Sequence, residues 1–589
     1  MSAEPAGLRK TQSPPALEAD GIGFEVGIAH HAILHPCNLD IRAGELVAIL
    51  GPSGAGKSTL ARLLAGQAPA SRGTVVLRGI PVSRTHAPGR LIAYLQQDDI
   101  LPQDLHVEEA LQTTGKIRNP EESSGTASKL IGKLMSRTGI THCCGMPVGR
   151  VSGGERRRIN ICAELMSDPL FLILDEPDTS LDPYHTRQLM KLARMIAHSG
   201  RAVIIVTHDV QNLQLFNKVA FLTEGRLVYY GPPLGLPSCF GVQTTNEVYR
   251  LFEAPVSAAE RSSLAEDWYQ RWQVRTTGHS GTDVRAGKKR DSVSPGLRSW
   301  DLSCVSPRQG WRQFLAVLWR SLLTLARDKL SLALFVIQPV MASVLILALA
   351  DANSLVMPVR FDMGAKQTLF TLCVVAALIS LINSHREIVR ERTIVRQEQY
   401  AGLGVGTYIL AKLVFLSLGC LIQIGILVMI LSIRVKIPDI DLLGSARTSI
   451  IAGLVLCALA NVSIGLLVST LVTAARQATY TLVPILVAEL SLGGLLFEVQ
   501  GILESTAKLT PVYWAYRSLG TAIDVNRFSP VLNNPNAMFE FTTANLRTTW
   551  LALIAVTAAC ILAAALVLSA QHKLRRPLHL WVACRKQSD

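Results

Sequence analysis

Hydrophobic and polar residues alternate in two different ways along this chain of 589 residues. In the first part, short apolar runs at 46–50, 170–174 and 202–206 are separated by stretches whose apolar residues recur at helical spacing. Short, uniformly apolar runs of this kind are typical of parallel strands that are buried on both faces. The pattern predicts an α/β domain with a parallel sheet over residues 21–233, preceded by a polar tail over residues 1–20.

The second part of the chain is dominated by apolar runs about as long as a membrane-spanning helix, which needs ~20 residues for ~30 Å of hydrocarbon. We predict an all-α transmembrane domain over residues 330–572. Its six spans are placed at about 330–350, 367–385, 408–431, 448–472, 478–498 and 549–570. Just before them, residues 311–329 carry Arg312, Arg320 and Arg327 between apolar positions, which predicts an amphipathic connecting helix along the inner membrane face.

Two polar segments separate or follow these domains. Residues 234–310 are polar and mixed, and are predicted to be a solvated linker. Residues 573–589 are predicted to be a tail. The first 20 residues contain no apolar core, so we expect no signal peptide and a cytoplasmic α/β domain.

Basic residues indicate the orientation in the membrane, because loops on the cytoplasmic side are enriched in Lys and Arg. Such residues lie between the second and third spans and after the last span, at Arg386, Arg390, Arg392, Arg396, Lys573, Arg575 and Arg576. The loop after the third span fits less well, because Arg434, Lys436 and Arg447 would face outward. An even number of spans places both termini in the cytoplasm. We expect a multi-pass protein of a plasma membrane or a bacterial inner membrane.

The composition narrows the class further. Hydrophobic residues make up 49% of the chain and charged residues 17%, and the formal net charge is +14. In a chain with a large apolar part, this excess indicates basic residues beside a membrane, and we expect no nucleic-acid partner. The 11 cysteines show no metal-ligand spacing. The adjacent Cys143 and Cys144 suit neither a zinc knuckle nor an ordinary disulfide.

A phosphate-binding loop follows the first predicted strand, because the sequence there fits G-x-x-x-x-G-K-[ST]. The residues predicted to bind nucleotide here are Gly51, Pro52, Ser53, Gly54, Ala55, Gly56, Lys57, Ser58 and Thr59. Lys57 is expected to reach the β- and γ-phosphates, while backbone N–H groups at a helix N-terminus cradle them. The Ser58 hydroxyl is expected to ligate Mg²⁺, so the predicted ligands are ATP and Mg²⁺.

Hydrolytic residues are predicted at the ends of two other strands. Asp175 follows the apolar run at 170–174 and is placed to hold Mg²⁺, and the adjacent Glu176 is placed to polarise the attacking water. His208 follows the next apolar run, where a group that senses the γ-phosphate belongs. Gln97 is predicted to couple Mg²⁺ or the water to the membrane domain, with Gln96 as the competing assignment.

A further anion-binding segment lies about 21 residues before Asp175. Ser152, Gly153, Gly154 and Glu155 form a predicted turn into a helix. The two glycines allow a ligand to approach the backbone, and the helix N-terminus favours an anion.

With these motifs the chain resembles the ATP-binding cassette (ABC) transporters, and its domain order resembles the G subfamily, the White-type half-transporters. The residues carrying the second resemblance are 97–101, 151–158 and 387–400. The resemblance implies that Ser152–Glu155 bind the nucleotide held by a second cassette, with Asp182 in contact across the dimer. It also implies that Glu387, Arg390 and Glu391 belong to a helix that couples the ATPase to the membrane domain.

Two positions depart from the family pattern. Asp178 stands where the family usually has Thr or a small residue, and it adds a charge near Asp182. The position expected to stack on adenine is Val26 instead of Tyr, with Phe24 as a partial substitute. Weaker stacking would lower the affinity for the base and loosen the discrimination between ATP and GTP.

Polar residues inside the predicted spans are candidate cargo ligands. Glu489 is the most unusual, because a carboxylate at mid-span costs roughly 2.5–3.5 kcal/mol on insertion scales. Asn461 and Gln338 are further candidates, although such residues more often make helix–helix contacts. For Glu489, a structural hydrogen bond or a misplaced span boundary is the alternative to cargo binding.

The expected function is that of an ABC-type ATPase coupled to transmembrane transport, working as a dimer of identical chains. The resemblance implies export of a hydrophobic or amphipathic cargo such as a lipid, a sterol-like compound, a pigment precursor or a drug. An ATPase that drives or regulates a partner membrane or extracytoplasmic protein without carrying cargo is the alternative. Import with an external binding protein stays open.

Overall fold

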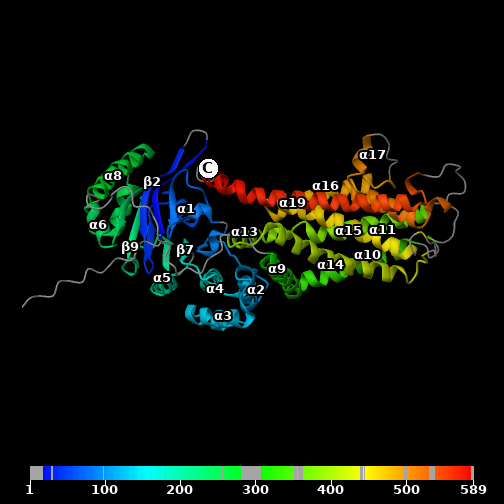
Figure 1. Ribbon diagram of the computed structural model, residues 1–589, viewed down its shortest axis with the longest axis horizontal. Helices are drawn as coiled ribbons and strands as arrows, with labels where there is room; N and C mark the ends of the chain where they lie inside the picture. The colour runs from blue at the N-terminus through cyan, green and yellow to red at the C-terminus, as the bar shows by residue number, and fades with distance from the viewer. Residues whose placement is uncertain are drawn as a thin grey trace, which may run out of the picture. The chain divides into compact units, whose positions relative to one another are not determined.

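The structure is a computed structural model (Figure 1). It describes residues 17–27, 31–85, 87–96, 98–179, 181–254, 257–279, 307–350, 355, 363–437, 442, 445–496, 502–528 and 537–585. The chain forms two units. The first takes in residues 1–312, 396–403 and 573–589, and the second takes in residues 313–395 and 404–572.

A six-stranded sheet forms the centre of the first unit, in the order β10-β9-β3-β8-β7-β6. Its strands are β3 (Leu46–Leu50), β6 (Ile92–Leu95), β7 (Phe171–Asp175), β8 (Ala202–Val206), β9 (Lys218–Thr223) and β10 (Arg226–Gly231). All are parallel except β10, which pairs antiparallel with β9. Every residue of β3, β6, β7 and β8 is buried. The predicted α/β fold is therefore confirmed, since each of these apolar runs is covered on both faces.

A second, antiparallel sheet was missed by the sequence analysis. It has the order β2-β1-β4-β5 and consists of β1 (Leu17–Val26), β2 (His31–Ile41), β4 (Arg72–Leu77) and β5 (Ile80–Pro81). Its inward-facing residues, such as Ile22 and Leu34, share one core with Ile49 and with Leu60 of α1. The outward positions are exposed or half-buried, so these strands do not read as continuous apolar runs.

Helices flank both sheets in the first unit (Figure 1). They are α1 (Lys57–Ala65), α2 (Val107–Arg118), α3 (Ser124–Thr138), α4 (Gly153–Leu165), α5 (Pro183–His198), α6 (Gly235–Phe240), α7 (Thr245–Glu253) and α8 (Ala258–His279). Short 3-10 helices are η1 (Val82–Arg84), η2 (Pro88–Arg90), η3 (Thr141–Cys143), η4 (Val148–Arg150) and η5 (Leu213–Leu215). Helices α6 to α8 occupy the first half of the predicted linker. Trp268 and Trp272 of α8 lie against Phe240 and Tyr229, with ring centroids 4.6 and 5.4 Å apart. These aromatic contacts anchor a segment whose polar composition predicted a linker.

The second unit is helical, and its long helices run side by side (Figure 1). Its helices, with those that continue into the first unit, are α9 (Pro307–Arg327), α10 (Lys329–Leu349), α11 (Met363–Ser384), α12 (Glu387–Arg390), α13 (Arg392–Tyr400), α14 (Val405–Leu431), α15 (Ala446–Leu471), α16 (Ala475–Leu492), α17 (Ile502–Ala507), α18 (Pro511–Ala522) and α19 (Thr543–Arg585). The 3-10 helices η6 (Val525–Phe528) and η7 (Ala537–Phe539) lie between α18 and α19.

Five helices of the described residues are long and apolar enough to cross a membrane. They cover Lys329–Ala348, Gly364–Arg390, Val405–Leu431, Ala446–Leu471 and Thr543–Gln571, and each overlaps one of the six predicted spans, whose crossing of a membrane stays a prediction. The remaining prediction, 478–498, coincides with α16, which is 18 residues long and is not among the five. This helix carries Arg476 and Glu489 and ends just before Gly493. The placement of both termini in the cytoplasm stays a prediction, because it rested on an even number of spans.

The connecting helix α9 is amphipathic, but one of the three arginines named above lies on its buried face. Arg312 and Arg327 are exposed, whereas Arg320 is fully buried because it belongs to a buried group of charges described below. The exposed face also carries the large apolar side chains of Leu315 and Trp319. This arrangement suits a helix in contact with lipid.

Glu489 explains how the segment after α16 is held. Its Oε2 accepts a hydrogen bond of 2.9 Å from the backbone N–H of Val512, in the first turn of α18. Glu489 is 3% exposed and Val512 is fully buried. A carboxylate at a helix N-terminus satisfies a donor that has no partner within the helix. The structural alternative for Glu489 therefore has a named partner.

We predict that Glu489→Leu lowers the free energy of unfolding by about 1–3 kcal/mol, because it leaves the buried N–H of Val512 without an acceptor. Glu489→Gln keeps an acceptor oxygen and should cost less. Thermal unfolding of the detergent-purified protein measures both. Glu504→Leu, which removes an exposed carboxylate paired with Lys508, is the control. Equal melting temperatures for Glu489→Leu and this control would contradict the assignment.

Candidate nucleotide site

The phosphate-binding loop leaves β3 at Gly51 and enters α1 at Lys57. Gly51, Gly54 and Gly56 have φ values of 143°, 80° and 90°, which residues with a side chain rarely adopt. At Gly51 a Cβ would lie 2.0 Å from the carbonyl oxygen of Leu222, so only glycine fits. Ser53 and Gly54 are exposed at the tip, while Ala55 and Thr59 are buried below it. The loop thus presents backbone N–H groups at the N-terminus of α1, an arrangement that binds phosphate.

Lys57 lies folded over this loop. Its Nζ donates hydrogen bonds of 2.9 Å to the carbonyl oxygen of Gly51 and 2.8 Å to that of Pro52. Burial lowers the pKa of Lys57, and the carboxylates of Glu176 and Asp175 act in the opposite direction. The ammonium group is therefore largely desolvated, which strengthens its attraction for a phosphate oxygen.

Ser58 and Asp175 meet where α1 begins and β7 ends. The Ser58 hydroxyl donates to Asp175 Oδ1 at 2.9 Å, and the Tyr94 hydroxyl donates to Asp175 Oδ2 at 2.7 Å. Hydroxyl and carboxylate oxygens are the donors that Mg²⁺ prefers, so this pair fits the ion. Gln97, the third predicted Mg²⁺ residue, lies outside the described residues. The competing Gln96 donates instead to Gln67 Oε1 at 3.2 Å.

Glu176 and His208 face each other at the ends of neighbouring strands. The His208 Nε2 lies 3.5 Å from Glu176 Oε1, and both side chains are partly exposed. Glu176 has a φ of 47°, and its N–H donates to the carbonyl oxygen of Val206. A positive φ in a non-glycine residue costs free energy and is often found at functional sites. Here it turns the carboxylate out of the strand direction, toward His208.

The segment Ser152–Glu155 forms the N-terminus of α4. Ser152 is the N-cap, and Glu155 Oε2 accepts hydrogen bonds from the Ser152 N–H and hydroxyl at 2.9 and 2.7 Å. A hydrogen bond from His142, with those from Ser152, lowers the pKa of Glu155 to about 2. Ser152 and Gly153 are exposed, and Gly154 is half-buried. The predicted turn into a helix is present, with its N–H groups open to an anion.

Asp182 and Asp178 have different surroundings. Asp182 caps α5, where it accepts hydrogen bonds from the N–H and Nδ1 of His185 at 2.8 and 2.6 Å. These bonds lower its pKa. Asp178 is turned toward Thr207, whose hydroxyl donates to Asp178 Oδ2, and burial raises the pKa of Asp178. The extra carboxylate thus supports the end of β8, next to His208.

Phe24, predicted as a partial substitute for the adenine-stacking residue, is 3% exposed and belongs to the core between the two sheets. Val26 is half-buried beside the same core. The prediction for Phe24 is therefore wrong in this structure, because the ring faces inward. Its position on an inward-facing register of β1 decided this, and the second sheet was not predicted.

Sequence reasoning missed three residues that support the site. Arg157 of α4 donates to the carbonyl oxygens of Gln96, Asp175 and Glu176 at 2.6, 3.1 and 3.3 Å. Arg157 thereby joins α4 to Asp175 and Glu176, yet in the sequence it is one of three successive arginines. The Tyr249 hydroxyl accepts a hydrogen bond from the Gly51 N–H at 3.1 Å, from within the predicted linker. Tyr94 is the third.

Residues 396–403 belong to the first unit although they follow the second span in the sequence. The Gln397 side chain donates to the carbonyl oxygen of Tyr94 at 2.8 Å and to Glu164 Oε1 at 3.0 Å. The Tyr400 hydroxyl contacts the carbonyl oxygens of Ala65 and Ile92 at 2.6 and 2.9 Å. This segment is thereby bound to α1, α4 and β6, so the residues that contact the ATPase unit lie after the predicted Glu387, Arg390 and Glu391.

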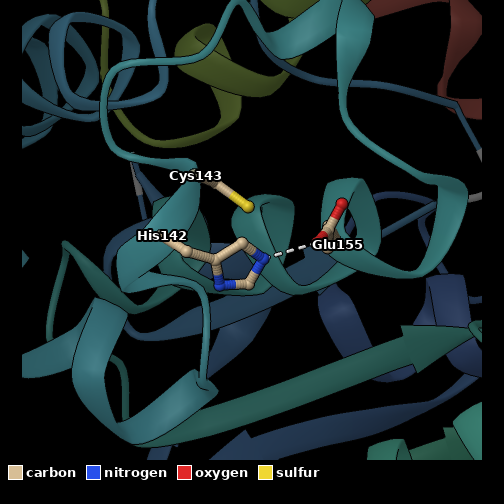
Figure 2. Close-up of side chains that lie close together, drawn as sticks. All are labelled: His142, Cys143 and Glu155. Carbon is tan, nitrogen blue, oxygen red and sulfur yellow. Dashed lines mark hydrogen bonds and ion pairs between the residues drawn. The ribbon is translucent and has the colours of Figure 1, made fainter.

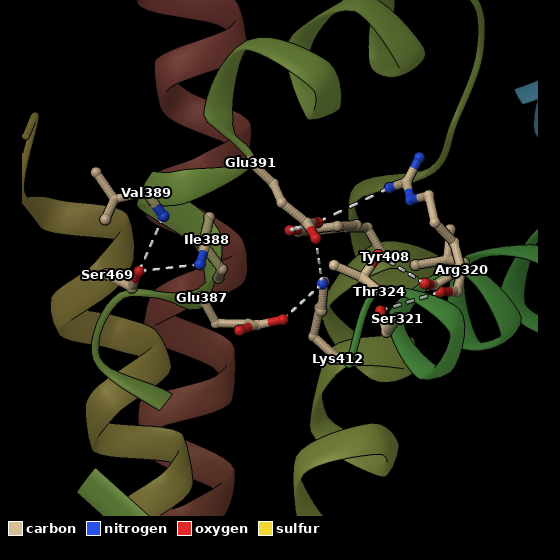
Figure 3. A network of polar contacts seen from close by, with 11 residues as sticks. Arg320, Ser321, Thr324, Glu387, Ile388, Val389, Glu391, Tyr408, Lys412 and Ser469 are labelled. Atoms are coloured by element: carbon tan, nitrogen blue, oxygen red, sulfur yellow. Dashed lines mark hydrogen bonds and ion pairs between the residues drawn. The ribbon is translucent and has the colours of Figure 1, made fainter. Parts of the chain in front are cut away.

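Two of the three predicted coupling residues, Glu387 and Glu391, lie around a buried lysine of the second unit (Figure 3). Lys412 Nζ donates to Glu387 Oε1 at 2.8 Å and to Glu391 Oε1 at 2.9 Å, and its side chain is fully buried. Arg320 Nη2 lies 3.8 Å from Glu391 Oε2. The structure thus brings Glu387 and Glu391 together. Arg390 points elsewhere, with its guanidinium 4.0 Å from Asp328 and 61% exposed.

The three cargo candidates have different surroundings. Glu489 binds the α18 N-terminus, as described above. Asn461 is fully buried, and its Nδ2 donates to the carbonyl oxygen of Cys457 in the same helix at 3.1 Å. Gln338 lies beside Pro339 in α10, and no donor among the described residues reaches its Oε1. The assignment of these residues to a cargo site stays a prediction.

Comparison with known proteins supports the two-part organisation. The ABC transporter family model matches residues 34–179, and the ABC-2 type transporter model matches residues 312–522. A hemin import ATP-binding protein of Streptomyces coelicolor is 34% identical over 253 residues, which are 41% of this chain and 88% of the relative. The ABC transporter model covers the phosphate loop, Ser152–Glu155, Asp175 and Glu176, and it ends before Asp182 and His208.

Two longer relatives extend over both parts. An ABC transporter ATP-binding/permease protein of Mycobacterium tuberculosis is 26% identical over 516 residues, 85% of this chain and 56% of the relative. ABC transporter G family member 7 of Arabidopsis thaliana is 27% identical over 408 residues, 63% of this chain and 54% of the relative. The chain spans about half the length of these two relatives. In this chain the ABC transporter model precedes the ABC-2 type transporter model, and this order together with the similarity to a G family member confirms the predicted resemblance.

We predict that Tyr94→Phe lowers the rate of ATP hydrolysis about tenfold, because one hydrogen bond to a charged carboxylate is worth about 1.5 kcal/mol. The Mg²⁺ concentration for half-maximal hydrolysis should rise, since Asp175 loses the partner of Oδ2. Steady-state hydrolysis at varied Mg²⁺ measures both effects. Tyr229→Phe, whose hydroxyl binds the Pro232 carbonyl oxygen, is the control. Wild-type values for Tyr94→Phe would show that the hydroxyl does not position Asp175.

We predict that Lys412→Met destabilises the protein by about 3 kcal/mol, because two carboxylates lose the cation between them. Adding Glu387→Gln and Glu391→Gln removes those charges and should recover most of the loss. Thermal unfolding of the purified single and triple variants measures the difference. If the triple variant unfolds at a lower temperature than Lys412→Met, the charge pairing is not the source of the effect.

Proposed function

We propose that this chain, which belongs to the ABC transporters and has the domain order of their G subfamily, works as an ATP-driven half-transporter. Two identical copies would export a hydrophobic or amphipathic molecule. The observation that carries the proposal is the convergence of Lys57, Ser58, Asp175, Glu176 and His208 at the carboxyl ends of β3, β7 and β8. Every copy of the chain carries the phosphate loop, the acidic pair, His208 and Ser152–Glu155, so both sites of a homodimer would be competent.

Hydrolysis would use each residue according to its contacts. The loop N–H groups and Lys57 bind the β- and γ-phosphates, and Ser58 and Asp175 hold Mg²⁺, which neutralises charge on the phosphate oxygens. Glu176 takes a proton from the attacking water as a general base. His208, 3.5 Å from Glu176, orients this water and the γ-phosphate. Arg157 binds the carbonyl oxygens of both acidic residues and so holds them at a fixed distance from α4.

The segment Ser152–Glu155, here called the signature segment, favours a dimer. Gly153 and Gly154 lie in the first turn of α4, where backbone N–H groups have no acceptor within the helix, and such a position binds an anion. In the proposed dimer, that anion is the γ-phosphate held by the partner's phosphate loop. Binding of two nucleotides would then close two cassettes, and hydrolysis would release them.

Transmission would pass along residues 387–403. Helix α13 is continuous from residues of the second unit to residues of the first. Its C-terminal half is bound to the Tyr94 carbonyl oxygen through Gln397, and the Tyr94 hydroxyl binds Asp175. Its preceding residue Glu391 is bound to the buried Lys412. A movement of Asp175 would thus be transmitted through Tyr94 and Gln397 to α13. The chain just before α13 is held in the second unit by the contact of Glu391 with Lys412.

The nature of the cargo is proposed from the surfaces of the membrane unit. The helices α10, α14 and α19 expose many large apolar side chains, among them Met341, Leu421 and Leu562. A molecule that is itself apolar or amphipathic can reach such a unit from within the bilayer. The direction of transport is taken from the resemblance to the G subfamily.

We predict that Glu176→Gln lowers ATP hydrolysis in lipid nanodiscs by about 10²–10⁴-fold, because the general base is lost, while ATP binding is retained. Glu224→Gln is a matched control, since Glu224 also has a positive φ, 44°, but lies in the turn after β9. The mass of single particles should correspond to two chains. A wild type that binds ATP but is monomeric or inactive would contradict the homodimer and indicate a missing partner.

A further inference from the structure

The side chains of His142 and Cys143, beside the segment Ser152–Glu155, have no part in the function proposed above. His142 and Cys143 of η3 lie next to Glu155 of α4 (Figure 2). His142 Nε2 is 2.6 Å from Glu155 Oε1, and the ligand atoms of all three residues lie within 4.8 Å of one another. The figure shows the Cys143 sulfur and the His142 ring on the same side, both directed toward the carboxylate.

We propose that His142, Cys143 and Glu155 bind a zinc-type divalent metal ion, which clamps η3 to the N-terminus of α4. The donor set is one imidazole, one thiolate and one carboxylate, the three ligand types that Zn²⁺ takes in proteins. With metal–ligand distances of about 2.0–2.3 Å, tetrahedral ligands lie about 3.3–3.8 Å apart. A separation of at most 4.8 Å therefore needs only small side-chain movements to close around an ion.

The exposure of the three residues also suits a metal site. The Cys143 side chain is fully buried, whereas the His142 side chain is 60% exposed and Glu155 is 21% exposed. An ion could enter from the exposed His142 side, and a water molecule could complete the coordination there. On binding, the Cys143 thiol loses its proton to solvent as the metal–sulfur bond forms.

The clamp acts on the signature segment because Glu155 has two oxygens with separate partners. Oε1 faces His142, while Oε2 accepts the hydrogen bonds from Ser152. A metal bound to Oε1 leaves the contacts of Ser152 in place and ties them to η3. We therefore expect bound metal to slow ATP hydrolysis by restricting the signature segment, a consequence that rests on the proposed function.

The test is metal binding by the full-length protein in lipid nanodiscs, with Co²⁺ as a spectroscopic probe and Zn²⁺ as competitor. We expect one ion per chain and a thiolate-to-cobalt charge-transfer band. His142→Ala and Cys143→Ser should each weaken binding by more than about tenfold, the loss that even outer-shell changes cause. Cys144→Ser is the matched control, because the adjacent Cys144 sulfur contacts Glu108 instead, at 3.1 Å.

Binding that persists in both His142→Ala and Cys143→Ser, or that is lost in Cys144→Ser, would overturn the site. His142→Ala removes an exposed side chain, so this variant should fold even if Cys143→Ser does not. Hydrolysis measured in excess Mg²⁺ should fall with Zn²⁺ in the wild type and stay unchanged in His142→Ala. Binding without any effect on hydrolysis would overturn the clamp. The binding measurement needs neither ATP nor cargo, so it is independent of the proposed function.

Discussion

The arrangement of the nucleotide site depends on the parallel pairing of β3, β8 and β7. In this pairing Ile49 lies opposite Val206, and Val206 lies opposite Asp175, so all three strands end at the same level. Parallel strands place their carboxyl ends at one edge of the sheet, and the residues after each strand meet there. The phosphate loop, the acidic pair and His208 lie at 51–58, 175–176 and 208 in the sequence but are adjacent for this reason. The backbone bonds Glu176 N–H to Val206 and Thr207 N–H to Ile49 extend the same register.

In the second unit, the pairing of buried charges determines how the helices are arranged. Lys412 is fully buried within an apolar helix, where an unpaired ammonium would be costly. Glu387 and Glu391 neutralise it, and Arg320 neutralises the remaining charge on Glu391. The same group fixes α9, α12 and α14 relative to one another. The backbone N–H groups of Ile388 and Val389, both bound to Ser469 at 3.0 Å, add α15. A polar cluster of this kind orients helices whose surfaces are predominantly apolar.

The sequence predicted the α/β fold, the phosphate loop, Asp175, Glu176 and His208 for a common reason. Each lies directly at the end of a short apolar run, and a buried parallel strand has few alternative interpretations. The antiparallel sheet was missed because its half-exposed strands lack such a run. Helices α6 to α8 were missed because their contacts are made by single aromatic residues spaced along a polar segment. The fifth predicted span coincides with α16, which ends at Leu492 and is not among the five helices long and apolar enough to cross a membrane.

By itself, the sequence determined the α/β nucleotide-binding fold, the order of the two domains and five long apolar helices, because these follow from local spacing and hydrophobicity. Only the tertiary structure decided which polar residues are partners. Arg157 is distinguished from its two neighbouring arginines by being buried against the ends of two strands. Lys412 finds its carboxylates about 20 residues away, and His142 and Cys143 find Glu155 across the turn into α4. Such pairings depend on the packing of elements that are distant in the chain, and hydrophobic periodicity carries no information about them.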